Sequence, residues 1–292
     1  MSVLESSLSS SRRVKDAVAT VLMWLAVMVA VVPLLFLIYY VVSKGVGIFG
    51  WSFLTKTIPE IQRQKGPGMG PAVIGTLLIT GAATLIAVPL GVLGAVYIVE
   101  YGAGNRLARV IRFLGDVMAG VPSIVMGLFI FTIWVVRFKG NGQTAFAGSL
   151  ALACLMLPIV IRSSESMLRL VPAELREASF ALGASKSRTI LTVVLPAAAA
   201  GITSGCLLAV ARAAGETAPL LFTVGLVSKF NYNLFKGANT TLSLQIFSNA
   251  QVIGAGPQQR AWGAALTLIL LVLLLTILAR IVSTRLTTTA RG

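Results

Sequence analysis

Two long stretches of the chain contain no charged residue, and they limit its possible folds more than any other feature. They run from Ala17 to Ser43 and from Ala261 to Ala279. A membrane's hydrocarbon core of about 30 Å takes about 20 apolar helical residues to cross, and only helices or closed barrels satisfy their backbone there. Charged residues make up 11% of the chain, against roughly 25% in soluble domains. We therefore expect an all-α protein that is integral to a membrane.

Four further apolar runs bring the number of predicted transmembrane segments to six. They cover 66–99, 117–136, 140–161 and 189–211, and the last continues to about 227. The first run is too long for the apolar part of a signal peptide, so it is expected to be a retained anchor. The expected division of the chain is a tail (1–16), a first helix (17–43), an outer loop (44–71), a transmembrane core (72–282) and a second tail (283–292).

The distribution of Lys and Arg predicts how the chain is oriented. With the N-terminus inside, fourteen of the 24 basic residues fall on the inner side, nine fall on the outer side, and Arg212 lies within the membrane. Inner loops are enriched in Lys and Arg, so both termini are expected to be cytoplasmic. The net charge of +15 follows from these loops, and no nucleic-acid partner is expected. There is no histidine, which removes the commonest general base and metal ligand.

A polar segment at 162–196, inside the core, is predicted to lie in the cytoplasm as two short helices. Pro172 and Glu174 suit the first turn of a helix, and Gly183 is placed to end it. Ser185 can cap a second helix that leads into the fifth span. Taken alone, this pattern is equally compatible with an amphipathic loop on the membrane surface.

The same segment resembles the EAA loop of ABC-importer permeases. Glu177-Ala178-Ser179 is followed after three residues by Gly183, and after nine more by Val193-Val-Leu-Pro196. The resemblance implies a six-span type I permease fold with a cytoplasmic coupling loop. In that family the loop docks on a separate ATPase subunit, so Glu177, Ala178, Ser179 and Gly183 would form the contact. The chain has no G-x-x-x-x-G-K-[ST] motif, so ATP would have to be bound elsewhere.

Arg212 and Glu216 form a charged pair inside the fifth apolar run. Their spacing of four residues places them on one helix face, within reach of an ion pair. A charge at this depth costs about 2.5–3.5 kcal/mol on insertion scales, so it usually faces the interior of the protein. An arginine that lines a transport path indicates an anionic solute. The alternative is a structural pair that holds this helix against a neighbour.

The segment Ala211-Arg-Ala-Ala-Gly-Glu-Thr-Ala-Pro-Leu-Leu-Phe-Thr223 is similar to the signature of phosphate-importer permeases of the PstA type. The segments 120–128 and 241–247 also resemble that family. The resemblance implies a phosphate path lined by Arg212, Glu216 and Thr217, in a multi-pass protein of the bacterial inner membrane. It also implies a PstC-type partner subunit, an ATPase dimer that binds ATP and Mg²⁺, and a periplasmic or lipid-anchored phosphate-binding protein. No cofactor is expected in this chain itself.

Several alternatives remain open at this point. A permease for another oxyanion would carry the same loop, and a stand-alone secondary anion carrier could use the same charged pair. A membrane enzyme is less favoured because no catalytic constellation is visible. Among the other charges, Asp116 is expected to accept hydrogen bonds at the membrane interface or to pair with Arg112, and Glu100 is expected to be solvated. Gly201 and Gly205 have the spacing of small-residue helix packing.

Overall fold

The computed structural model describes residues 10–61, 63–64, 66–102, 104–138 and 142–289, and all regular structure within these ranges is helical. The helices are α1 (Ser10–Gly45), α2 (Trp51–Thr55), α3 (Gly70–Val96), α4 (Arg106–Gly120), α5 (Ser123–Ile130), α6 (Ala145–Arg169), α7 (Ala173–Ala181), α8 (Lys186–Thr189), α9 (Leu195–Gly215), α10 (Leu220–Thr223), α11 (Leu242–Ala250) and α12 (Ala255–Thr289). Three π-helical turns extend neighbouring helices, at Tyr97–Tyr101, Phe131–Val135 and Ile190–Val194.

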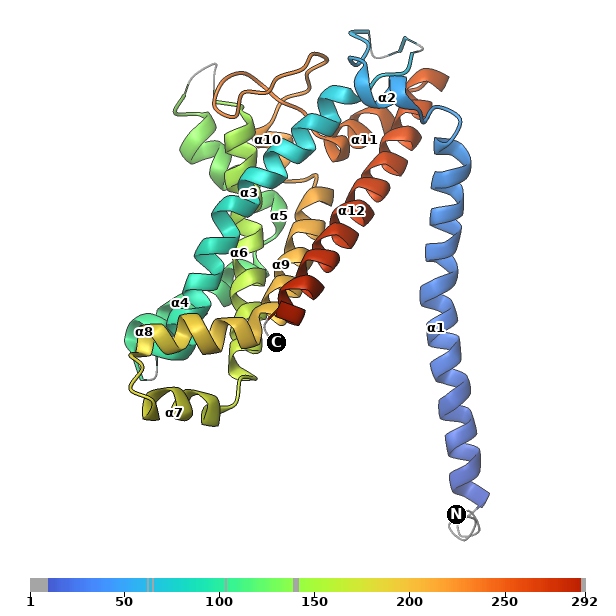
Figure 1. Ribbon diagram of the computed structural model, residues 1–292. Coiled ribbons are helices and arrows are strands. Elements are labelled where there is room, and N and C mark those ends of the chain that lie inside the picture. Colours follow the sequence, from blue (N-terminus) through green and yellow to red (C-terminus); the bar gives the residue numbers. More distant parts are fainter. Residues whose placement is uncertain (1–9, 62, 65, 103, 139–141, 290–292) are drawn as a thin grey trace.

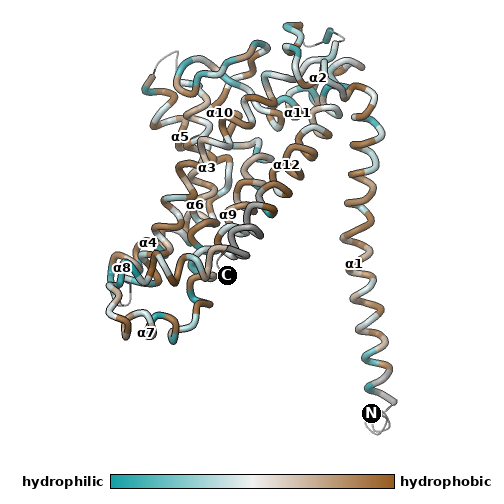
Figure 2. Tube along the Cα trace, in the orientation of Figure 1, coloured by the Kyte–Doolittle hydropathy of each residue, from teal (hydrophilic) through white to brown (hydrophobic). Residues whose placement is uncertain are grey.

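The helices form a tilted bundle around α3, α6 and α9, with short helices at its two ends (Figure 1). We name these the α7 end and the α11 end. The core of the bundle combines alanines with larger apolar side chains, among them Ile79, Leu152 and Met156. Apolar residues follow the long helices, whereas hydrophilic residues gather at both ends (Figure 2). This distribution matches the bilayer-crossing architecture expected from the sequence.

Small residues allow α9 to lie close against α6. A side chain at Gly201 would lie 2.2 Å from Met167 Sδ, and one at Gly205 would lie 2.4 Å from Ser163 Oγ. Lipid tails are as apolar as the helix surfaces, so the hydrophobic effect does not bring helices together in a membrane. Close van der Waals packing is a main source of their association instead. The small-residue packing predicted for this glycine pair is therefore confirmed.

Five helices in the described residues are long and apolar enough to cross a membrane. Two shorter segments joined by a sharp bend form a sixth crossing if they are counted together as one span. That pair is α4 with the segment Ser123–Val135, and the bend between them is 108°. The sequence predicted one unbroken span over 117–136, and this is wrong, because the chain turns sharply at Val121 and Pro122. Val121 has extended backbone, as expected for a residue before proline.

Two further boundaries differ from those expected. Helix α6 continues to Arg169, well past the predicted end of the fourth span at residue 161. The fifth span is one continuous helix from Lys186 to Gly215, and it does not extend to residue 227. Figure 1 shows that α9 stops short of the α11 end of the bundle, so the chain becomes irregular at depth within the bundle.

Helix α1 stands apart from the rest of the molecule along most of its length (Figure 1). Its most apolar window is 0% buried within this chain. It meets α12 only near its C-terminal end, where Gly45 lies against the carbonyl of Trp262 and the side chain of Leu266. A splayed helix of this kind leaves an open space between α1 and α12.

Candidate functional site

The charged pair Arg212 and Glu216 lies where helix α9 ends. Helix α9 stops at Gly215, and Glu216 has extended backbone with φ −68° and ψ 137°. Arg212 Nε donates to Glu216 Oε1 over 3.5 Å. The ion pair predicted from the spacing is present, but the expectation that both residues share a helix face is wrong. The carboxylate therefore belongs to the irregular segment that follows the helix.

The irregular backbone after α9 is held by the start of α11. Ser243 Oγ donates to the carbonyl of Glu216 over 2.8 Å. The amide of Leu242 donates to Thr76 Oγ1 on α3 over 2.9 Å. The carbonyl of Thr217 accepts from the amides of Leu220 and Leu221, which begins the short helix α10. Non-helical backbone is tolerated in a membrane only where protein or water satisfies it, and here protein does so.

The arginine is on the surface of this chain rather than inside it. The Arg212 side chain is 68% exposed, whereas that of Glu216 is 18% exposed. The cavity beside the pair, between α6 and α9, holds about 10 Å³, which is room for about one water molecule. An oxyanion does not fit there. A charge facing lipid is costly, so this face of the chain requires water or another subunit against it.

Helix α7 carries the residues predicted to contact an ATPase, and it projects from one end of the bundle (Figure 1). None of its nine residues, all of which the structure describes, is buried. Glu177 and Ala178 are exposed, and Ser179 Oγ lies 2.9 Å from Thr189 Oγ1 on α8. Gly183 has a φ of +80°, a conformation that favours glycine, and the helix ends before it as predicted.

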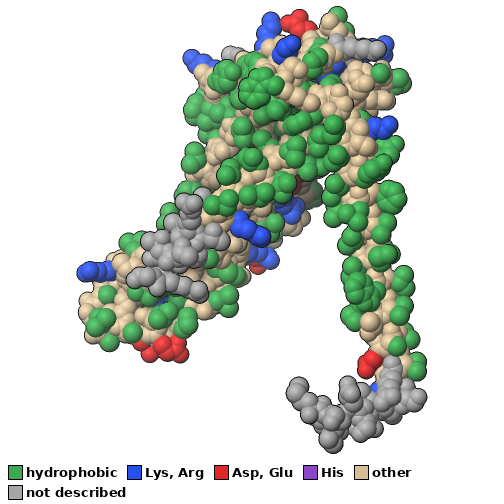
Figure 3. Space-filling model, turned by 45° about the vertical axis from the view of Figure 1, so that its right-hand side comes forward, with side chains coloured by type: hydrophobic (Ala, Val, Ile, Leu, Met, Phe, Trp, Pro, Cys, Tyr) green, Lys and Arg blue, Asp and Glu red, His purple; other side chains and the backbone are tan. Residues whose placement is uncertain are grey.

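The tip formed by α7 combines apolar and acidic side chains. Leu182 is 90% exposed, Leu170 is 73% exposed, and Phe180 is 45% exposed. Glu174 and Glu177 are exposed among them, and Figure 3 shows acidic and apolar side chains together at this end. The end of α7 therefore presents apolar and acidic side chains together on the surface of this chain.

The structure also reveals ion pairs at the α7 end that the sequence did not predict. Glu100 is not solvated as expected, because its side chain is 8% exposed and it pairs with Arg176 on α7. Asp116 pairs with Arg162 on α6, and not with Arg112. These partners are 46 to 76 residues apart, so no local spacing could have identified them.

A second cluster of ion pairs joins α4 to α6. Glu165 on α6 accepts from Arg112 on α4 over 2.9 Å and from Arg169 over 2.8 Å. Its side chain is 13% exposed, so two guanidinium groups compensate one nearly buried carboxylate. Only the pair with Arg169, one helical turn away, follows from spacing in the sequence.

Comparison with known proteins gives matches that cover nearly the whole chain. The profile of the family described as "Binding-protein-dependent transport system inner membrane component" matches residues 87–288. Phosphate transport system permease protein PstA 1 of Mycobacterium tuberculosis is 46% identical over 95% of this chain and 92% of its own length. Phosphate transport system permease protein PstA of Yersinia pestis is 41% identical over 93% of this chain and 90% of its own.

Solved structures share the fold at low sequence identity. A bacterial ABC transporter involved in the import of the acidic polysaccharide alginate matches 94% of this chain and 99% of its own, with a TM-score of 0.60 and 14% identity. The inward-facing MetNI methionine ABC transporter matches 73% of this chain and 91% of its own, with a TM-score of 0.56 and 20% identity. The chain belongs to the family of binding-protein-dependent transport system inner membrane components, among the PstA-type permeases of ABC importers.

Proposed function

We propose that this chain is one of two membrane-spanning permease subunits of an ATP-driven importer of inorganic phosphate. The observation that carries the proposal is its similarity, over nearly its whole length, to permeases named for phosphate transport. The site supplies a physical reason for an anionic substrate, because Arg212 presents a guanidinium to the surface at the end of α9. A guanidinium matches the oxygens of a phosphate in a bidentate geometry.

The substrate path lies between this chain and a second permease subunit. Two observations support this: the side chain of Arg212 is 68% exposed, and the cavity beside it holds only about 10 Å³. Arg212, Glu216 and Thr217 line one half of the path, and a PstC-type subunit supplies the other half. Glu216 holds the guanidinium in place and accepts a hydrogen bond from the protonated oxygen of the bound phosphate.

Helix α7 couples the path to an ATPase dimer that binds ATP and Mg²⁺. Glu177, Ala178, Ser179 and Gly183 form the contact, and the exposed Leu182 and Phe180 extend it. The small side chain of Ala178 lets the ATPase approach the helix closely. In this arrangement the chain performs no covalent chemistry, and the energy for transport comes from the partner.

The α7 end faces the cytoplasm in this proposal, and both termini lie on that side of a bacterial inner membrane. The α11 end then faces the periplasm and receives phosphate from a soluble or lipid-anchored binding protein. The excess of Lys and Arg in the segments at the α7 end supports this orientation. The basic residues of the outer loops, among them Lys229 and Lys236, attract an anion to the entrance.

Uptake of labelled phosphate into proteoliposomes tests the proposal. The vesicles contain the chain with its PstC-type, ATPase and binding-protein partners, and matched vesicles omit the ATPase or contain this chain alone. We expect uptake that requires ATP and every partner and that excess sulfate does not block. Uptake by this chain alone without ATP would instead identify a secondary carrier. Preferential uptake of a competing oxyanion would identify an importer of that ion.

A further inference from the structure

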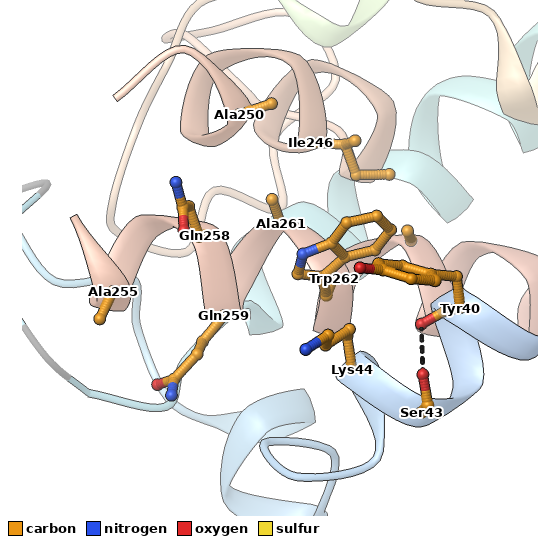
Figure 4. A pocket seen from close by; sticks show the side chains of 11 residues that line it. Tyr40, Ser43, Lys44, Ile246, Ala250, Ala255, Gln258, Gln259, Ala261 and Trp262 are labelled. Carbon is orange, nitrogen blue, oxygen red and sulfur yellow. Dashed lines mark hydrogen bonds between the residues drawn. The ribbon is translucent and has the colours of Figure 1, made fainter. Parts of the chain in front are cut away.

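Helix α11 is short, polar and largely buried, although it lies at one end of the bundle. The buried polar residues of this helix and its cap are Thr241, Ser243, Gln245 and Asn249. Burying polar groups costs free energy unless hydrogen bonds compensate it. The second half of α11 is held by α12, where Ile246 of α11 and Trp262 of α12 line one cavity (Figure 4). The first turn of α11, by contrast, contacts α3 and the segment that carries Glu216.

Helix α3 determines where α11 starts. The hydroxyl of Thr76 accepts a hydrogen bond from the amide of Leu242 over 2.9 Å and donates its own proton to the carbonyl of Ala72 over 2.8 Å. Any side chain at Gly75 would overlap the carbonyl of Thr240, so the backbone before α11 lies directly against α3. The first turn of α11 is therefore fixed on one of the central helices of the bundle.

Two hydroxyl groups then connect this turn to Glu216. Ser243 Oγ donates to the carbonyl of Glu216 over 2.8 Å and lies 3.1 Å from Thr241 Oγ1. A hydroxyl has a single proton to donate, so Thr241 must be the donor in its contact with Ser243. Thr241 Oγ1 also accepts from the amide of Leu244 and so caps α11. Hydrogen bonds in such a chain strengthen one another.

The bond from Ser243 fixes the direction of the Glu216 carbonyl. Rotation about ψ determines where this carbonyl points, and ψ is 137° at Glu216, far from the helical value near −42°. In this conformation the Glu216 carboxylate lies 3.5 Å from Arg212 Nε. A partly exposed ion pair of this length is weak, so it does not hold the carboxylate in place by itself. The hydroxyl of Ser243 supplies a further constraint from the buried side.

We propose that Ser243 is a positioning residue for Glu216 and so contributes to the preference for phosphate over sulfate. This role rests on the proposed function, in which Glu216 meets the transported ion. The Ser243 side chain is 4% exposed and donates its proton to a carbonyl, so it acts through Glu216 and does not bind the ion. Removing the hydroxyl should lower the preference about fivefold, the factor that corresponds to one net hydrogen bond.

A double-mutant cycle in the complete complex separates positioning from a purely structural role. Competition between labelled phosphate and sulfate is measured in proteoliposomes with wild type, Ser243→Ala, Glu216→Gln and the double variant. Ser243→Ala should lower the phosphate-to-sulfate ratio when Glu216 is present and leave it unchanged in the Glu216→Gln background. Ser243→Thr retains the hydroxyl and should retain the ratio. An equal decrease in both backgrounds, or no decrease in either, would overturn the proposal.

Ser149→Ala is the matched control for the loss of a buried hydroxyl. Ser149 on α6 is also buried, and its hydroxyl contacts the carbonyls of Ala145 and Ile79, so it joins α6 to α3 without touching Glu216. The control should leave the phosphate-to-sulfate ratio unchanged. A decrease as large as that of Ser243→Ala would show that loss of packing alone alters selectivity, and it would overturn the proposal.

A labelling experiment tests Ser243 independently of which ion is transported. Thr217→Cys is introduced into the complex in a Cys154→Ala and Cys206→Ala background, and its rate of reaction with a water-soluble thiol reagent is measured. Ser243→Ala should raise this rate about fivefold by releasing the segment after α9, and Ser149→Ala should not. A wild-type complex without phosphate preference would contradict the proposed function, whereas faster labelling would still support the role of Ser243. An unchanged labelling rate in a complex that prefers phosphate would overturn the role of Ser243 alone.

Discussion

Arg176 on α7 and Glu100 at the end of α3 form the most buried ion pair in the described part of the chain. Arg176 Nη2 lies 2.9 Å from Glu100 Oε1, and the side chains are 19% and 8% exposed. The same guanidinium donates to the carbonyls of Leu168 and Val171 over 3.1 and 2.7 Å. One side chain thus joins α7 to the ends of both α3 and α6.

Removing Arg176 is expected to be more harmful than neutralising Glu100. Arg176→Gln leaves a buried carboxylate and the carbonyls without their donor, and breaking a buried pair in this way costs about 3–5 kcal/mol. Glu100→Gln keeps an acceptor oxygen facing the arginine, so its cost should be smaller. Thermal unfolding of the assembled complex, together with phosphate taken up per ATP hydrolysed, measures both effects. Greater damage from Glu100→Gln would contradict the structure.

Alanine substitutions at Gly75 and Gly81, two glycines of α3, are expected to have different effects on stability, because only Gly75 lies against residue 240. A Cβ at Gly75 would lie 1.8 Å from the carbonyl oxygen of Thr240, whereas one at Gly81 meets nothing within 4 Å. Gly75→Ala should destabilise the protein by about 1–3 kcal/mol through overpacking and displace the start of α11. Gly81→Ala should be neutral or stabilising by up to about 1 kcal/mol. Thermal unfolding of the two purified variants tests this prediction. Equal melting temperatures would show that α3 and residue 240 are farther apart than the structure places them.

The exposed carboxylate of Glu177 gives a prediction for the ATPase contact. Glu177→Lys should weaken binding of the ATPase and reduce ATP-driven uptake about tenfold, because it reverses a charge in the proposed contact. The control is Glu60→Lys at the opposite end of the molecule, where the side chain is 74% exposed. Co-purification of the ATPase with each variant is the measurement. Loss with both variants, or with neither, would remove Glu177 from the interface.

Glu216 is expected to contribute to the choice between phosphate and sulfate. At neutral pH phosphate carries an O–H that sulfate lacks and that can donate a hydrogen bond to a carboxylate, and a charged acceptor bonds more strongly than an amide. Glu216→Gln should therefore reduce the preference for phosphate over sulfate, on the order of tenfold. Competition between the two labelled ions in proteoliposomes measures the ratio. An unchanged ratio would assign the selectivity to other residues.

The features that local sequence patterns could predict are those formed by residues close in the chain. The apolar runs predicted α1 and α12, and spacing predicted the contact of Arg212 with Glu216. Gly215 and Pro219 indicated a break in helix regularity near the pair, but spacing could not predict that Ser243, 27 residues further on, donates to the carbonyl of Glu216. The pairing of Glu100 with Arg176 likewise depends on how α7 folds back against α3. Such contacts are set by tertiary packing and leave no periodic signal.

The proposed place of Arg212 in an ATP-driven phosphate path can be tested by one comparison of transport rates. ATP-dependent phosphate uptake is measured in proteoliposomes with wild type and Arg212→Ala, each assembled with all its partners and with ATP hydrolysis recorded in parallel. Loss of a charge-assisted contact to the anion predicts a fall in uptake of at least about tenfold, while the complex remains assembled. Normal uptake by Arg212→Ala would show that the pair with Glu216 is only structural and that Arg212 does not contact the transported anion.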